Sequence, residues 1–302
     1  GKDNNKNMIE YIIIAILAGI LIGIITGLIP GLHINLLIAI FSGLSVSIFL
    51  KLDPLITSVF IISLSTTHII VGFVPSIYLG VPNSDTALNV LPGHRMVKQG
   101  LGHQALILNL YGGLIGLLIV ILLSPIIFLL IPRLYQGISS YIGYILIIIC
   151  ILLIIHNKKD YVWAIIILIL SGILGIFALN GAYIKEPLLP LFSGLFGLST
   201  LLISINSQNK IPRQKLNKFQ TNKKYLLKYS FIGSIFSSVF AFLPTISPSQ
   251  IIVFISSVFG KIKTKDYLVL IGTINTAAFV ISIFALYLFL KARNTAVFFI
   301  YQ

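Results

Sequence analysis

The sequence predicts an all-α, polytopic helical membrane protein with inverted repeats and broken or re-entrant helix hairpins. Charged residues make up only 9% of the 302 residues, and the mean hydropathy is +1.05. A soluble domain carries roughly 25% charged residues, so these charges are too few to cover a soluble surface. Apolar runs long enough to cross a hydrocarbon core of about 30 Å recur along the chain. Two short breaks within otherwise apolar stretches, one at Pro30 and one at Pro244 and Pro248, lie near the two ends of the chain.

The same composition excludes other classes of protein. An open sheet would leave backbone groups unsatisfied in lipid, and a membrane β-barrel would show alternating segments of about ten residues. The run 145–155 is apolar without alternation. A net charge of +14 is compatible with nucleic-acid binding, but the basic residues are not interleaved with stacking aromatic residues in a soluble module. The single cysteine, Cys150, lies in an apolar run and excludes a disulfide framework.

The apolar runs define the expected membrane segments, which are 9–28, 32–50, 54–80, 104–131, 138–155, 161–180, 187–205, 230–243, 249–260, 267–290 and an unfinished run from Thr295. We divide the chain into five regions: a flexible amino terminus (1–8), a first membrane repeat (9–131), connecting membrane helices (132–206), a basic loop (207–229) and a second, inverted repeat that we expect to be incomplete (230–302). The chain is therefore expected to be truncated at its carboxy terminus, with a naturally short chain as the alternative.

The loop 207–229 is the main polar interruption. It contains basic residues and no acidic ones: Lys210, Arg213, Lys215, Lys218, Lys223, Lys224 and Lys228. The positive-inside rule predicts that this loop is cytoplasmic and that the protein is a multi-pass protein of the plasma membrane. A merely solvated basic linker would predict the same topology.

The segments 230–243 and 249–260 are too short to cross the membrane singly, and the linker between them contains Pro244 and Pro248. We interpret them as two helices that meet inside the membrane, where free backbone groups must be buried in protein or line a polar cavity. The stretch 27–35 has a similar design. An odd number of spans separates the two units, so the second is expected to be inverted. Inverted repeats with discontinuous helices are typical of secondary transporters.

Helices that begin at these breaks would direct free N–H groups and positive dipole ends toward an anion. The predicted substrate-binding residues are Pro30, Gly31, His33, Asn35, Thr245, Ser247 and Ser249. Alternatively, Gly27 and Gly31 serve only close helix packing, and His33 is only a cap or an interhelical hydrogen-bond partner.

The stretch 79–100 concentrates turn formers, hydroxyl groups and amides between two apolar segments, and we interpret it as an ordered functional loop. A coupling cation needs oxygen ligands, and a proton carrier needs a titratable group, so the predicted coupling residues are Asn83, Asp85, Thr86 and His68. The coupling ion is expected to be Na⁺ or H⁺, and no cofactor or metal site is expected.

These residues also have structural interpretations. Asp85 is alternatively a helix cap, and His68 a satisfied polar residue. A topology cluster is expected at His94, Arg95 and Lys98. Helix caps are expected at Asp53 and Asp266.

Several motifs, taken in order, resemble the large transmembrane subunit family of the tripartite tricarboxylate transporters, and most resemble its archaeal branch. They are the stretches 27–33, 67–68, 75–80, 85–88, 91–95, 99–100, 188–197 and 291–293. The resemblance implies ion-driven uptake of di- or tricarboxylates, with an extracytoplasmic binding protein and a small membrane subunit as partners. Where the second repeat of the family usually has Pro-Gly, this chain has Pro244-Thr245, and the remaining carboxy-terminal helices of the family are absent from the sequence.

Three classes of function follow. The first is a non-enzymatic, ion-gradient-driven secondary transporter of small organic anions. The second is a translocase for an anionic lipid such as a polyprenyl phosphate. The third is an intramembrane hydrolase that uses Asp85 with His68 or His94, but no paired carboxylates and no nucleophile with its base accompany them.

Overall fold

The computed structural model describes residues 2–29, 32, 53–80, 87–156, 160–180, 194, 198, 202, 211–216, 222–240, 242, 246, 248–260 and 262–289. Nearly all of these residues are helical, and none of them lies in a strand. Five of the described stretches are long and apolar enough to cross a membrane: Met8–Leu28, Pro54–Tyr78, Gly102–Leu152, Tyr161–Ala178 and Thr264–Phe289. The predicted fold class, a polytopic helical membrane protein, is confirmed.

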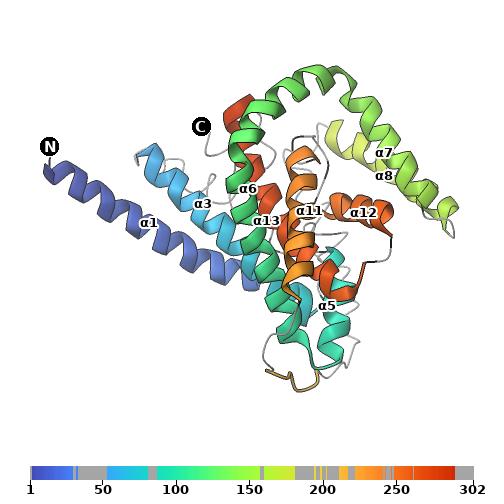
Figure 1. Ribbon diagram of the computed structural model, residues 1–302, viewed down its shortest axis with the longest axis horizontal. Coiled ribbons are helices and arrows are strands. Elements are labelled where there is room, and N and C mark those ends of the chain that lie inside the picture. Colours follow the sequence, from blue (N-terminus) through green and yellow to red (C-terminus); the bar gives the residue numbers. More distant parts are fainter. Residues whose placement is uncertain are drawn as a thin grey trace.

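Three groups of helices follow one another along the chain (Figure 1). The first group is α1 (Lys2–Leu28), α3 (Pro54–Val71), α4 (Phe73–Tyr78) and α5 (Ala87–Lys98). The second is the long α6 (Gly102–Ile138), the short 3₁₀ helix η1 (Ser139–Tyr141), α7 (Ile142–His156) and α8 (Tyr161–Asn180). The third is α11 (Lys223–Phe240), α12 (Pro248–Phe259) and α13 (Thr264–Phe289).

Helices α1 and α3 form a close parallel pair, because a glycine recurs every four residues on the face of α1 that meets α3. A Cβ atom on Gly19 would lie 2.7 Å from the carbonyl oxygen of Phe60, and one on Gly27 would lie 2.9 Å from that of His68. Later residues of α1 thus meet later residues of α3, so the two helices run in the same direction. Small residues permit such backbone contact between membrane helices.

Helices α6, α11 and α13 form a second parallel group. A Cβ atom on Gly272 of α13 would overlap the carbonyl oxygen of Asn109 in α6, so the two backbones touch. The hydroxyl of Thr273 donates to the carbonyl oxygen of Gly112 in α6 (2.8 Å) and to Ser230 Oγ in α11 (3.3 Å). Almost all of the residues between Leu268 and Leu286 of α13 are buried, so α13 is the centre of the fold.

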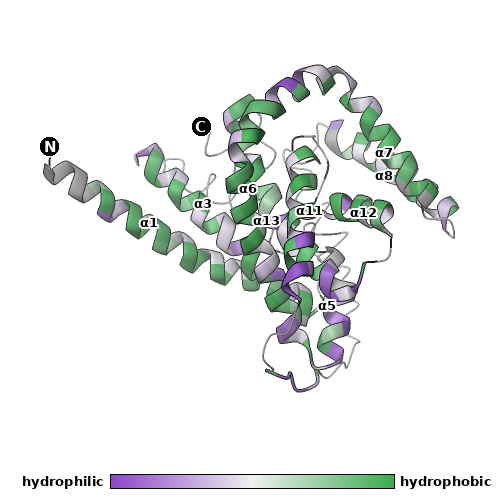
Figure 2. Ribbon diagram, in the orientation of Figure 1, coloured by the Kyte–Doolittle hydropathy of each residue, from purple (hydrophilic) through white to green (hydrophobic). Residues whose placement is uncertain are grey.

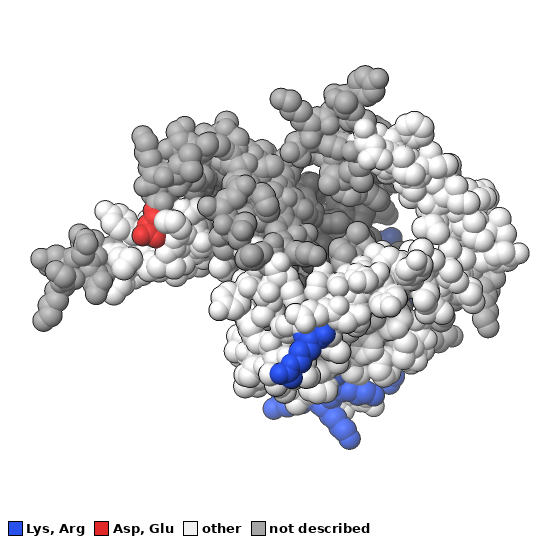
Figure 3. All heavy atoms as spheres, turned by 90° about the horizontal axis from the view of Figure 1, so that it is seen from above, with Lys and Arg blue, Asp and Glu red and all other residues white. Residues whose placement is uncertain are grey.

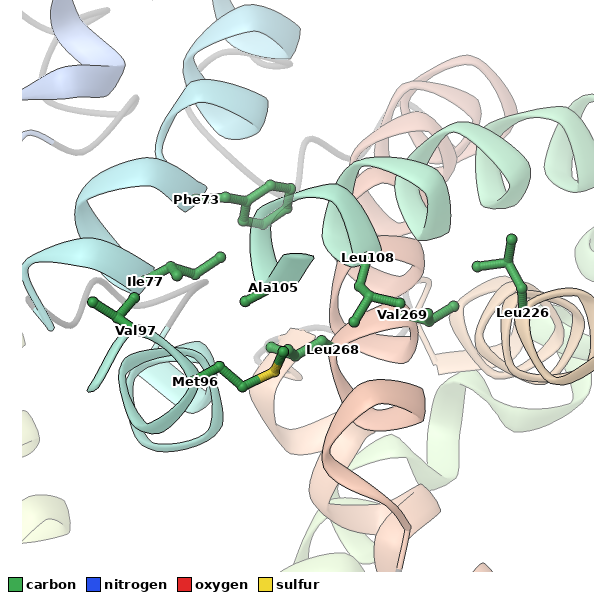
Figure 4. Packing of buried hydrophobic residues seen from close by; sticks show 9 residues of the cluster. All are labelled: Phe73, Ile77, Met96, Val97, Ala105, Leu108, Leu226, Leu268 and Val269. Atoms are coloured by element: carbon green, nitrogen blue, oxygen red, sulfur yellow. The ribbon is translucent and has the colours of Figure 1, made fainter. Parts of the chain in front are cut away.

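The two groups run in opposite directions. Helix α4 continues from the end of α3, and its Phe73 and Ile77 pack in one cluster with residues near the starts of α6, α11 and α13 (Figure 4). Those partners are Ala105, Leu108, Leu226, Leu268 and Val269. The end of α3 therefore lies at the level where the other three helices begin. This is the arrangement that inverted repeats predict for the pairs α1–α3 and α11–α13.

Three predicted boundaries are wrong. Residues 87–98, expected to be part of a loop, form α5, which accommodates Pro92. Helix α11 begins at Lys223 within the predicted basic loop and has 18 residues, about 27 Å of helix. Lysine side chains at the start of a membrane helix reach the interface while their carbon chains stay in apolar surroundings, so they do not end the helix. The predicted break before residue 138 lies inside α6, which contains Pro132.

Hydrophilic residues gather where α5 ends and α6 and α11 begin, a region that we call the basic end (Figure 2). Basic residues there include Arg95, Lys98, Arg213, Lys215, Lys223 and Lys224. On the face seen in Figure 3, acidic side chains lie on the side of α1 and α3, whereas Lys and Arg lie on the side of the α6–α11–α13 group.

Candidate functional site

Two of the predicted site residues, His68 and Ser249, lie among the described residues. The others lie outside them: Pro30, Gly31, His33, Asn35, Asn83, Asp85, Thr86, Thr245 and Ser247. The structure therefore bears on the helices that lead to these residues and on the polar groups buried between those helices.

His68 is buried in α3 and faces α1. Its Nδ1 lies 3.1 Å from the hydroxyl oxygen of Thr26, and that hydroxyl donates to the carbonyl oxygen of Ile22 (2.8 Å). Because the Thr26 proton is used within α1, the arrangement favours the tautomer in which Nδ1–H of His68 donates to Thr26. The imidazole is thus a titratable group held at a fixed place in a membrane helix, as a coupling residue requires.

Ser65 lies one turn before His68. Its side chain is fully buried, and its hydroxyl has no hydrogen-bond partner among the described residues. Gly23 and Gly27 pack directly on this part of α3, since their Cβ atoms would lie 2.8 Å from the carbonyl oxygen of Leu64 and 2.9 Å from that of His68. Close packing thus accounts for Gly27, as one of the two interpretations predicted.

A hairpin of α4 and α5 leads to the predicted coupling residues 83–86. Gly93 packs against Ile77, and His94 Nδ1 lies 3.4 Å from the Ile77 carbonyl oxygen. Gly80 has φ of 68°, a left-handed conformation that favours glycine, and it faces the His94 ring. His94 was predicted to belong to a cluster of basic residues that sets the membrane topology. It instead packs between α4 and α5, whereas Arg95 is exposed.

Helix α12 begins at Pro248, which places the half-buried Ser249 in its first turn. Proline suits the first turn of a helix because its missing N–H needs no partner there. The predicted start of a half-helix near residues 247–249 is confirmed, and α12 is a short apolar helix of 12 residues. Its first turn lies where the sequence predicts that helix N–H groups and a positive dipole end meet an anion.

Sequence reasoning missed a set of polar groups buried in the α6–α11–α13 core. Asn275 is 3% exposed, and neither its Oδ1 nor its Nδ2 has a hydrogen-bond partner within the described ranges. The same holds for Asn109 Oδ1, Thr276 Oγ1 and Ser237 Oγ. The criterion that selected His68, a polar residue inside an apolar span, would have selected Asn275 as well.

The segment 211–216 is fastened to the first repeat at the basic end. Gln214 Oε1 accepts from Gly102 N–H (2.8 Å), and its Nε2 donates to the Val97 carbonyl oxygen (3.1 Å). Lys215 N–H donates to the Gly100 carbonyl oxygen (2.8 Å). The connection between the repeats is therefore tied to the turn that joins α5 and α6.

The two predicted caps differ. Asp53 caps α3, since its Oδ1 accepts from Leu55 N–H (2.8 Å). Asp266 instead lies within the first turn of α13, close enough to Lys228, Lys263 and Lys265 for electrostatic interaction. No group of three His, Cys, Asp or Glu side chains that could hold a metal ion occurs in the described part of the chain.

Comparison with known proteins places this arrangement in a family. A family model described as the tripartite tricarboxylate transporter TctA family matches residues 13–302. The chain belongs to this family. The resemblance inferred from the TctA-like motifs is thus confirmed, and the chain is a member of a family of transporter components.

One curated relative is an uncharacterized protein of the archaeon Methanocaldococcus jannaschii, 32% identical to this TctA-family chain over 234 residues. The matched region is 75% of this chain and 57% of the relative, so the chain spans little more than half the length of that protein. No solved structure matches the chain.

Proposed function

We propose that this protein is the membrane subunit of a secondary transporter that moves di- or tricarboxylates across the plasma membrane, driven by a Na⁺ or H⁺ gradient. The observation that carries the proposal is the opposite direction of the two parallel helix pairs, α1–α3 and α11–α13. Transporters built from inverted repeats bind substrate and ion near the membrane midplane, between the repeats. Membership of the TctA family supports carboxylates as the substrate class.

In this proposal the anion binds at the interrupted helices. The first turn of α12, with Ser249, provides N–H groups and the positive end of a helix dipole. Residues 30–35 and 245–247 supply the remaining contacts, as the sequence predicts. The ion is coupled through residues 83–86 and His68, whose imidazole lies between α1 and α3.

The basic end is proposed to be cytoplasmic. Arg95, Lys98, Arg213 and Lys215 lie together there because Gln214 fastens their segments to each other. Basic residues beside membrane helices are concentrated in cytoplasmic loops. The family name also supports two partners, an extracytoplasmic binding protein and a small membrane subunit.

The decisive experiment is counterflow in proteoliposomes that contain the full-length gene product. We expect labelled citrate or succinate to exchange under a Na⁺ or H⁺ gradient, and a polyprenyl phosphate not to move. Exchange of the polyprenyl phosphate alone would replace the proposal with the lipid translocase. A folded protein that moves neither class of substrate would overturn it.

Sidedness is tested with single cysteines in a Cys150→Ser background, since Cys150 is the one cysteine of the chain. Lys215→Cys lies at the basic end, and Ser140→Cys lies beyond the far end of α6, about 55 Å of helix away. Both positions are exposed. In intact cells we expect an impermeant maleimide to label Ser140→Cys and to spare Lys215→Cys. The reverse pattern would invert the topology.

A further inference from the structure

Asn275 lies in the middle of α13, on the same face as a residue that packs in one cluster with α4. Leu268, seven residues earlier and so on the same face, packs in one cluster with Phe73 and Ile77 of α4. The adjacent residues of α13 point elsewhere: Ile274 packs in the cluster that contains α12, and Thr276 contacts Gly113 of α6. Helix α13 also contacts α3 and α5.

Ser65 of α3 lies at about the same depth as Asn275. Phe73, just past the end of α3, shares a cluster with Leu268, near the start of α13, and the two helices are antiparallel. Seven residues along α13 from Leu268 reach Asn275, about 10 Å away, and a similar distance back from Phe73 reaches Ser65 in α3. Each side chain is at least nine-tenths buried, and neither has a hydrogen-bond partner among the residues that the structure describes.

Two polar side chains, one from each repeat and at one depth, lack a partner among the described residues. A buried amide without hydrogen bonds is unfavourable by several kcal/mol in apolar surroundings. Buried polar groups without partners are expected where a bound ligand completes their hydrogen bonds. The Nδ2 group of Asn275 offers two N–H donors and Ser65 offers one O–H donor, which suits a carboxylate.

We propose that Asn275 of α13 and Ser65 of α3 bind one carboxylate group of the transported anion between the two repeats. This inference rests on the proposed function and extends it to a second-repeat residue outside the interrupted helices. The bound carboxylate accepts from Asn275 Nδ2 and from Ser65 Oγ. His68, which bonds Thr26 of α1, lies one turn from Ser65 in the same helix, so α3 connects the proposed site with the predicted coupling residue.

The test uses purified protein with citrate and succinate as probes. The variants are Asn275→Ala, Asn275→Leu, Asn275→Asp and Ser65→Ala. Ser282→Ala is the matched control, because Ser282 shares the face of Asn275 and is equally buried, yet its hydroxyl donates to the Phe279 carbonyl oxygen (2.6 Å). The readouts are the thermal midpoint without ligand, its rise on adding the carboxylate, and KM and kcat for counterflow.

We expect Asn275→Ala to bind the carboxylate about 10- to 100-fold more weakly, the effect of a lost hydrogen bond to a charged group. Asn275→Asp should abolish binding through repulsion between two carboxylates. Asn275→Leu should raise the thermal midpoint without ligand, since no hydrogen bond is lost, and should remove the rise on adding ligand. Ser282→Ala should keep the ligand response of the parent protein.

Three results would overturn the inference. The first is an unchanged KM and ligand response in Asn275→Ala, and the second is anion binding preserved in Asn275→Asp. The third is a lower ligand-free midpoint in Asn275→Leu with normal binding, which would mark a structural residue. In each case the parent protein still binds carboxylate, so the proposed function stands. A parent protein that binds neither probe would instead count against the proposed function itself.

Discussion

The two parallel helix pairs use different chemistry to reach the same close packing. In α1–α3 the contact is made by glycines at four-residue spacing, and the outer faces of both helices are exposed, as lipid-facing surfaces are. In the α6–α11–α13 group, serine and threonine hydroxyls bond between helices, from Thr273 to Gly112 and Ser230 and from Ser234 to Gly116. The first pair has neighbours mainly on one side and can shift as a unit, whereas the second is fixed within the core. The α1–α3 pair is therefore the better candidate for the element that moves during transport.

The largest expected effect is in the core. Gly272→Ala would place a Cβ atom on the backbone carbonyl of Asn109, and neither backbone can retreat between α6 and α11. We expect the free energy of unfolding to fall by more than the roughly 1–3 kcal/mol of ordinary overpacking, so that little monodisperse protein is recovered in detergent. Gly175→Ala is the control, because a Cβ atom there has no described neighbour within 4 Å. A Gly272→Ala protein as stable as that control would end the distinction between a rigid and a movable pair.

A similar change in the first pair should be milder. Gly23→Ala places a Cβ atom 2.7 Å from Thr67 Cβ, but the exposed side of α1 lets the helix move away. We expect the free energy of unfolding to fall by about 1–3 kcal/mol while the fold is retained, and we would measure this as a lower thermal midpoint. Leu21→Ala, on the exposed face of the same helix, is the control. An effect as severe as that of Gly272→Ala would show that the first pair is as constrained as the second.

The long apolar helices could be predicted from the sequence, because an apolar segment in lipid must satisfy its backbone hydrogen bonds internally, as a helix does. The prediction was wrong where a helix contains polar residues. Helix α5 contains Pro92 and Gly93, and α11 begins at Lys223, so the sequence pattern predicts a loop at both places. Of the candidate site, His68 and the start of α12 at Pro248 were predictable from local pattern.

Asn275 was not singled out, because its significance lies in the absence of a partner within the described structure. That depends on which face of α13 meets α6, α12 and the first repeat. Such facing is a property of tertiary packing, and hydrophobic periodicity is a poor guide to it in a helix apolar on all sides. A polar residue within an apolar span is visible in the sequence, but whether it is satisfied is not.

Hydroxyl groups allow a finer comparison of the two pairs. Thr273→Val keeps the shape of the side chain but removes the bonds to Gly112 and Ser230. We expect the free energy of unfolding to fall by about 0.6 kcal/mol, the average for hydrogen bonds between membrane helices, and by no more than about 1.7 kcal/mol. Thr273→Ser should recover most of it. Equal midpoints for the Val and Ser variants would mean that shape, and not hydrogen bonding, holds the second group together.

The matching change in the first pair, Thr26→Val, should alter ion dependence more than packing, because the pair is held mainly by its glycines. Thr26 accepts from His68, so the substitution instead leaves Nδ1 of a buried imidazole without that partner. If His68 takes part in coupling, the dependence of transport on pH or Na⁺ should shift in Thr26→Val and stay unchanged in Thr273→Val. Counterflow measured across a range of pH and Na⁺ concentrations separates the two variants. Identical ion dependence in both would remove His68 from coupling, and the difference between the two pairs would then be one of packing alone.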